Sequence, residues 1–90
     1  MAAKKRVLVV DDQPGILDLL ADVLLDSGYE VALAMNGQEA VAKLSQSPFD
    51  LVVSDLHMPR WSGFDLLRWM KANGRKEKVV VMTGPAERQA

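Results

Sequence analysis

The stretch Leu51-Val52-Val53-Ser54-Asp55-Leu56-His57-Met58-Pro59 decides how this chain folds. A short apolar run such as the one that opens it is typical of a strand buried on both faces of a parallel sheet. Asp55 then lies at the carboxyl end of the strand, before a loop that closes on a proline. This edge is where open α/β sheets bind their ligands, although an aspartate that merely opens a turn gives the same pattern.

A second apolar run with the same kind of ending comes earlier in the chain. Residues 7–10 are all Val or Leu, and two acids, Asp11 and Asp12, follow them. If the two strands are parallel neighbours, their ends lie about 5 Å apart, and three carboxylates crowd one edge. Two unit charges 4 Å apart repel by about 4 kcal/mol at an effective dielectric near 20. A divalent cation removes this repulsion, and an all-oxygen acidic site suits Mg²⁺, which joins carboxylates to phosphate.

The composition is that of one ordinary globular domain. Ninety residues allow a single domain. Eleven basic against twelve acidic side chains leave a net charge of −1, so no excess of positive charge indicates nucleic-acid binding. The chain has no cysteine, so disulfides, zinc–thiolate sites and thiol catalysis are excluded. No apolar segment reaches the length of a membrane span, and no signal peptide is recognisable. We therefore expect a cytoplasmic protein with no direct nucleic-acid or membrane partner.

Strand and helix patterns alternate along the chain. Strands are expected at residues 7–10, 29–34, 50–54 and 79–82. Between them, apolar residues recur at helical spacing, which predicts helices after Pro14, after the turn at Asn36-Gly37, and from Phe64 to the stop at Asn73-Gly74. The resulting βαβαβαβ order with short connections indicates an α/β fold built on a parallel sheet.

Local signals refine the first two helices. Pro14 suits the first turn of a helix, and Gly28 is placed to end it. Asn36, with Glu39 three residues later, resembles a capping box. The apolar stripe of the first helix, which we expect to face the core, contains Ile16, Leu20 and Leu24, with Leu19 and Val23 at the same spacing.

Three segments together resemble the CheY-like receiver domain of two-component response regulators. They are the acidic pair Asp11-Asp12, the run from Asp55 to Pro59, and Thr83-Gly84 after the fourth strand. The resemblance implies a doubly wound, flavodoxin-like parallel sheet with strand order 2-1-3-4-5. Residues 1–90 would then form an incomplete receiver domain with order 2-1-3-4, because the fifth strand and last helices of the family have no counterpart before Ala90.

The same resemblance assigns roles to individual residues. Asp55 matches the phosphoacceptor, which receives a phosphoryl group from a sensor histidine kinase or a phosphotransfer protein. Asp11, Asp12, Asp55 and the backbone carbonyl of His57 match the Mg²⁺ ligands, and Thr83 matches the hydroxyl that contacts the phosphoryl group and acts as a switch. The aspartyl phosphate would change interactions with partners or an output domain. Its later hydrolysis would be an intrinsic autophosphatase activity rather than dedicated enzymatic turnover.

The chain departs from the family in one respect. The family lysine at the end of the fifth strand is missing; Lys76 and Lys78 precede the fourth strand, and Arg60 and Arg88 are poor substitutes. The fourth strand would also be an exposed apolar edge, which is a site for pairing with another chain. Either the sequence is part of a longer chain that covers this edge, which is the interpretation we favour, or the edge is covered by another protein or by self-association with another copy.

Two other functions remain open at this stage. The chain could be a receiver-like interaction module that is not phosphorylated, because the lysine is absent. A phosphatase of the haloacid dehalogenase type also uses an aspartate after a strand, but it needs a second acid where this chain has His57.

The His57 side chain is expected to be exposed, with its carbonyl as the functional group. Trp61 is expected to contact a partner or to report Mg²⁺ binding by fluorescence.

Overall fold

The computed structural model describes residues 4–58 and 61–82. The strands and helices are β1 (Arg6–Val10), α1 (Pro14–Asp26), β2 (Glu30–Ala34), α2 (Gly37–Gln46), β3 (Leu51–Asp55), α3 (Gly63–Ala72) and β4 (Lys78–Met82). All neighbouring strands pair in parallel, in the order β2-β1-β3-β4. The predicted α/β fold and strand order are therefore confirmed, with strand bounds that differ by one residue from those expected.

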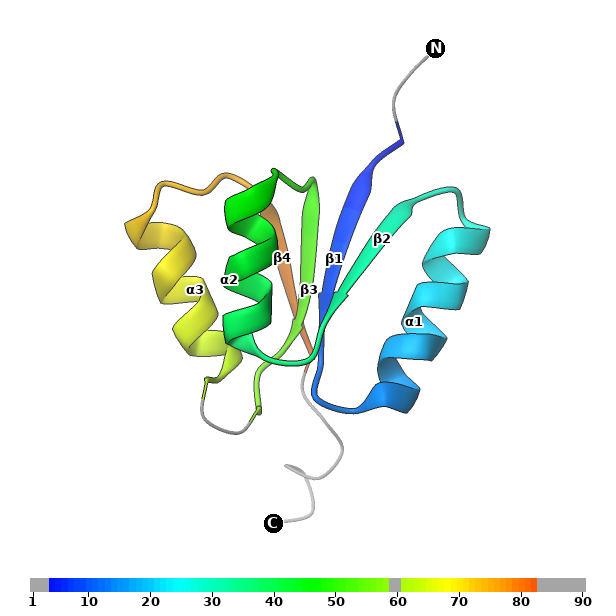
Figure 1. Cartoon of the computed structure of the whole chain (residues 1–90), viewed down its shortest axis with the longest axis horizontal. Helices are drawn as coiled ribbons and strands as arrows, with labels where there is room; N and C mark the ends of the chain where they lie inside the picture. Colours follow the sequence, from blue (N-terminus) through cyan, green and yellow to red (C-terminus); the bar gives the residue numbers. More distant parts are fainter. Residues whose placement is uncertain (1–3, 59–60, 83–90) are drawn as a thin grey trace.

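Helices cover the two faces of the sheet unequally (Figure 1). α1 lies on one face, and α2 and α3 lie on the other. Since successive side chains of a strand point to opposite faces, β1 contributes to two separate apolar clusters. Leu8 and Val10 join the cluster with α2 and α3, whereas Val7 and Val9 join the cluster with α1. None of the helices in the described part of the chain is long and apolar enough to cross a bilayer.

The core face of α1 differs in part from the predicted stripe. Leu20 and Leu24 pack against the sheet as expected, and Ile16 is half-buried. The fully buried residue of α1 is Leu17, which the spacing argument did not assign to the core. Two other residues at the predicted spacing are more than half exposed. They are Leu19 and Val23. Leucines and valines surround most of this helix, so spacing alone did not identify the side that faces the sheet.

Side-chain caps explain where α2 and α3 begin. The Asn36 side chain accepts a hydrogen bond from the Glu39 N–H at 2.8 Å, as predicted, but the Glu39 carboxylate accepts from the Met35 N–H instead of completing a box with Asn36. α3 has a full capping box between Ser62 and Asp65. The helix therefore begins at Gly63, one residue before the Phe64 predicted from the sequence.

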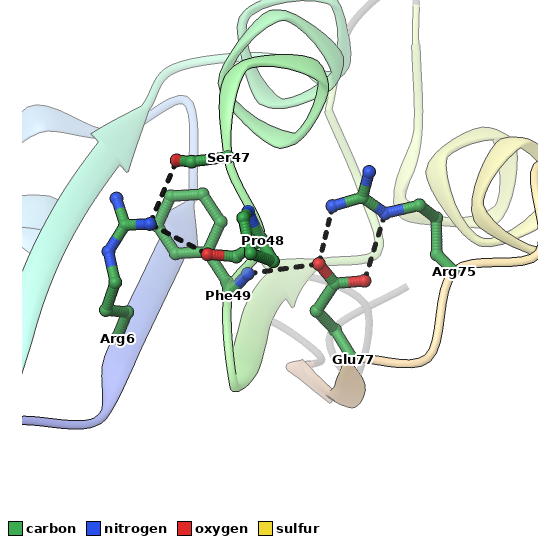
Figure 2. Close-up of polar contacts among 6 residues, drawn as sticks. All are labelled: Arg6, Ser47, Pro48, Phe49, Arg75 and Glu77. Carbon is green, nitrogen blue, oxygen red and sulfur yellow. Dashed lines mark hydrogen bonds and ion pairs between the residues drawn. The ribbon is translucent and has the colours of Figure 1, made fainter. Parts of the chain in front are cut away.

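An arginine–glutamate pair holds the amino-terminal end of the sheet between β3 and β4 (Figure 2). Arg75 donates two hydrogen bonds to Glu77, from Nη2 to Oε2 at 2.6 Å and from Nε to Oε1 at 3.1 Å. The backbone N–H of Phe49 donates to the same Glu77 Oε2 at 3.1 Å. Glu77 therefore ties the segment before β4 to the residue that leads into β3.

Arg6 makes the corresponding contacts on the side of β1. Its Nη1 donates to Ser47 Oγ at 2.9 Å and to the Pro48 carbonyl oxygen at 2.8 Å, and its guanidinium lies 4.5 Å from the centroid of the Phe49 ring (Figure 2). Its backbone N–H donates to Asp50 Oδ2 at 2.7 Å. The loop before β3 is thus attached to both neighbouring strands at this end.

Glu77 provides a test of this attachment. Burial alone would raise the pKa of the Glu77 carboxyl, but hydrogen bonds from Arg75 and from the Phe49 N–H outweigh that effect, and the pKa lies below its ordinary value. The ionised carboxylate therefore stabilises the fold above the pKa of the unfolded chain. That contribution is lost as the pH falls through the lower pKa of the folded state.

We expect Glu77→Gln to lower the free energy of unfolding by about 2 kcal/mol at neutral pH, because it removes a buried charged acceptor. Urea unfolding measures the change. Glu30→Gln is the matched control, since Glu30 is exposed and lies 3.9 Å from Arg6; we expect a loss below about 1 kcal/mol. The difference between wild type and Glu77→Gln should shrink as the pH falls below about 4.3. Equal losses in the two variants would contradict this assignment.

Candidate functional site

Three carboxylates converge at the carboxyl ends of β1 and β3. Asp11 and Asp12 follow β1, Asp55 is the last residue of β3, and the two strands are parallel neighbours. One carboxylate oxygen from each residue lies within 4.8 Å of the others. Within the described ranges, no other group of three or more acidic or histidine side chains comes together in this way. The structure thus brings together the three acids that the strand patterns singled out.

Asp11 is the most enclosed member of this acidic cluster (Asp11, Asp12 and Asp55). Asp11 is only 4% exposed, and its Oδ1 accepts a hydrogen bond from the Gln13 N–H at 2.9 Å. Burial raises the pKa of the Asp11 carboxyl; the bond from Gln13 opposes this rise, and the charges of Asp55 and Asp12 add to it. The ionised form of Asp11 is therefore disfavoured by its surroundings, and a cation at the cluster would relieve it.

Asp55 is oriented by the loop that follows it. The His57 N–H donates to Asp55 Oδ1 at 3.0 Å, and the Leu56 N–H continues the sheet by donating to the Met82 carbonyl oxygen at 3.1 Å. The His57 side chain is exposed, as expected. The proposed use of its backbone carbonyl as a ligand stays a prediction.

Two apolar side chains between β3 and α3 pack against the core. Met58 is buried in the cluster with α2 and α3, and Trp61 packs partly against the same cluster. The Trp61 ring also covers Gly37, and its expected contact with a partner stays a prediction. Gly63 was not singled out at all, yet a Cβ there would lie 2.6 Å from the Asp55 carbonyl oxygen. The available signal in the sequence was Gly63 and two large apolar side chains, Met58 and Trp61, soon after Asp55.

Several residues discussed from sequence lie away from the acidic cluster or cannot be placed. Thr83, Arg60 and Arg88 are outside the described residues. Lys78 is the first residue of β4, and Lys76 precedes that strand, so both lie at the end of the sheet opposite the acidic cluster. This placement agrees with the expectation that neither Lys76 nor Lys78 takes the place of the family lysine.

The acidic cluster has the donor set that a hard divalent cation prefers. All three side chains supply carboxylate oxygens, and their separations allow one ion to contact them. Oxygen ligands of this kind suit Mg²⁺ better than softer transition metals. The residues present therefore fit a magnesium ion.

Comparisons with known proteins point to one family. The family description "Response regulator receiver domain" matches residues 7–90. A response regulator receiver protein of Anaeromyxobacter is 40% identical over 79 residues, which are 88% of this chain and 33% of that protein. Sporulation initiation phosphotransferase F of Bacillus subtilis is 35% identical over 92% of this chain and 67% of its own length. The chain thus spans only a part of each of these relatives.

A solved structure has a similar fold. The response regulator TrrA of Thermotoga maritima, in complex with Mg²⁺ and BeF, superimposes with a TM-score of 0.83 at 37% identity, over 94% of this chain and 75% of that one. The strand order, the positions of the acids at the strand ends and the family match over residues 7–90 all agree. This chain belongs to the response regulator receiver domain family.

Proposed function

We propose that Asp55 of this receiver domain accepts a phosphoryl group from a phosphohistidine on a sensor histidine kinase or a phosphotransfer protein. The observation that carries the proposal is the convergence of Asp11, Asp12 and Asp55 within 4.8 Å at the ends of two adjacent strands. Phosphoryl transfer depends mostly on positioning and electrostatics, and this arrangement offers both at one carboxylate.

In the proposed transfer, one oxygen of the Asp55 carboxylate attacks the phosphorus atom. Because Oδ1 accepts the His57 N–H, we assign Oδ2 as the nucleophile. Oδ2 forms a bond to phosphorus, the bond between phosphorus and the donor imidazole nitrogen breaks, and that nitrogen keeps the electron pair and takes up a proton. The product is an aspartyl phosphate, an acyl phosphate that water can later hydrolyse back to the Asp55 carboxylate and free phosphate.

A magnesium ion would be held by Asp11, Asp12, Asp55 and the backbone carbonyl of His57. When bound, it would neutralise the negative charge that the carboxylates and the incoming phosphoryl group share. The burial of Asp11 supports this assignment, because a carboxylate enclosed beside two others gains most from a cation. The Mg²⁺ complex of the related TrrA protein is consistent with it.

The consequence of phosphorylation would be a switch in binding. Thr83 follows β4 directly in sequence, and β4 is the neighbour of β3. Its hydroxyl would contact the phosphoryl group and draw its segment toward Asp55, which would change how the cytoplasmic protein binds its partners or an output domain. Membership of the receiver family favours this function over an interaction module that is not phosphorylated.

The first test is direct phosphorylation. Incubation with acetyl phosphate and Mg²⁺ should add the mass of one phosphoryl group to the wild-type protein, and intact-mass spectrometry measures it. Asp55→Asn should abolish the addition, because an amide is not a nucleophile for phosphorus. Asp22→Asn, an exposed acid on α1, should leave it unchanged. Absence of labelling in the wild type would support the non-phosphorylated module, and undiminished labelling in Asp55→Asn would show that Asp55 is not the phosphoacceptor.

A second test concerns the metal. Without Mg²⁺, Asp11→Asn should raise the free energy of unfolding by about 1 kcal/mol, because it removes a like charge from the acidic cluster while the amide oxygen can still accept the Gln13 N–H. In the wild type, Mg²⁺ at ten times its Kd should add about 1.4 kcal/mol, or about 5–10 °C in Tm. Asp11→Asn should lose most of that increment.

Differential scanning calorimetry with Mg²⁺ and with EDTA measures both effects. Asp22→Asn serves again as the control, and it should retain the full Mg²⁺ increment. An Asp11→Asn protein that is less stable than wild type without metal, yet gains as much from Mg²⁺, would show that Asp11 has a structural role and is not a ligand.

We also propose that the protein self-associates through β4. Among the described residues β4 is the outer strand on its side of the sheet, and two of its apolar side chains, Val80 and Val81, are 50% and 42% exposed. An apolar strand edge with unpaired backbone groups is a template for pairing with a second chain.

Sedimentation velocity over a range of concentrations tests this proposal. The wild type should show a concentration-dependent dimer, and Val81→Lys should shift it to monomer, because a charged side chain on a strand edge opposes pairing. Leu19→Lys removes an apolar side chain of α1 that is even more exposed, at 59%, and should not affect the dimer. A wild type that stays monomeric at the highest concentration would refute self-association.

A further inference from the structure

The first turn of α2 contains a glycine, Gly37, in direct contact with the ring of Trp61. Gly37 is buried, and a Cβ built on it would lie 1.8 Å from Cε3 and 2.7 Å from Cδ2 of Trp61. Real Cβ atoms do not approach a ring that closely, so the indole of Trp61 rests directly on the backbone of α2. The contact joins the loop between β3 and α3 to the start of a different helix.

Backbone conformation does not account for glycine at this position. Among the glycines in the described ranges, only Gly28 and Gly74 have positive φ. Glycine is less favourable than alanine within a helix, and the start of α2 is already capped by Asn36. The space that the Trp61 ring occupies is therefore the reason that position 37 carries no side chain.

The loop that carries Trp61 is fixed at both ends. The Gly63 N–H donates to the Leu56 carbonyl oxygen at 3.1 Å, and a Cβ on Gly63 would lie 2.6 Å from the Asp55 carbonyl oxygen. The start of α3 thus lies directly against the end of β3. Between these points, Met58 is buried against α2 and α3, and the Trp61 ring on α2 is a second anchor.

This loop determines how the acidic cluster is presented. The His57 N–H donates to Asp55 Oδ1 at 3.0 Å, so a displacement of the loop turns the Asp55 carboxylate relative to Asp11 and Asp12. We propose that Trp61, seated on Gly37, is a positioning residue for the acidic cluster. It holds the His57 amide where it orients the Asp55 carboxylate. The part of this inference that concerns Mg²⁺ rests on the proposed function; the part that concerns the loop rests on geometry alone.

Gly37→Ala tests the inference in a protein whose other tryptophan is removed by Trp69→Phe, which leaves Trp61 as the single tryptophan. The new methyl group should displace the ring and shift Trp61 emission to longer wavelength. Without Mg²⁺, exchange of the His57 amide hydrogen, measured by NMR, should rise on the order of tenfold, and the Kd for Mg²⁺ should rise by a similar factor. Exchange of the β1 amides should not change.

Gly15→Ala is the matched control. Gly15 also lies in the first turn of a helix, α1, and a Cβ there would meet nothing within 4 Å. This variant should keep the emission, the His57 exchange rate and the Mg²⁺ affinity of its parent. Effects as large as those of Gly37→Ala would show that any alanine near the acidic cluster disturbs it, and would overturn the inference.

A double-mutant cycle separates positioning from general stability. Trp61→Ala should itself raise His57 exchange, and Gly37→Ala/Trp61→Ala should match Trp61→Ala alone, because no ring remains to be displaced. Effects that multiply would mean that the two residues act independently, against the inference. If Gly37→Ala does not fold, Trp61→Ala decides: unchanged His57 exchange and unchanged Mg²⁺ affinity would overturn the positioning role.

The two proposals fail in different ways. If the wild type binds no Mg²⁺, the proposed function fails, while the exchange of His57 in the absence of metal still decides whether Trp61 positions the loop. If the wild type binds Mg²⁺ and Gly37→Ala moves the Trp61 emission with no change in His57 exchange, the positioning role fails and the proposed function stands.

Discussion

Repulsion among three carboxylates at the ends of two neighbouring strands is the constraint on which the rest of this structure depends. Parallel pairing places Val10 of β1 beside Ser54 of β3, so the acids that follow them in sequence cannot avoid one another. Burial of Asp11 strengthens the effect, since water no longer screens its charge fully. A fold that keeps this repulsion must hold both strand ends firmly, because a small relaxation would disperse the charges.

The strands are held mainly from their opposite end and from both faces. Apolar side chains of β1 enter the clusters on either side of the sheet, which fixes the middle strand. At the amino-terminal end, the Phe49 N–H donates to Glu77, and Glu77 is paired with Arg75. This contact sets the relative position of β3 and β4 from the end that carries no acidic cluster. Polar contacts there and charge repulsion at the other end are thus separated by the length of the sheet.

The sequence predicted those features that depend on strand periodicity, and it did not predict those that depend on contacts between distant segments. Apolar runs with acidic ends predicted parallel strands whose like ends meet, whereas the strand order that makes β1 and β3 neighbours, and so brings Asp11, Asp12 and Asp55 together, came from the resemblance to the receiver family. The choice of Leu17 over Leu19 as the buried residue needed the orientation of a helix that is apolar around much of its surface. The contact of Trp61 with Gly37 joins residues that only the packing of α2 beside α3 brings together, so no local pattern could reveal it.

The neighbours of Asp55 differ in how much packing opposes their movement, and this difference bears on how a switch could operate. Movement of the loop between β3 and α3 would take Met58 and Trp61 out of the apolar cluster with α2 and α3. On the other side, the Leu56 N–H bonds to the Met82 carbonyl oxygen, at the end of a strand whose Val80 and Val81 are already half exposed. Local rearrangement costs least where the fewest buried contacts must break. A charge added at Asp55 would therefore act on the end of β4 more readily than on the loop that orients the carboxylate. The rigid side of the acidic cluster would then preserve its geometry while the loosely packed side responds.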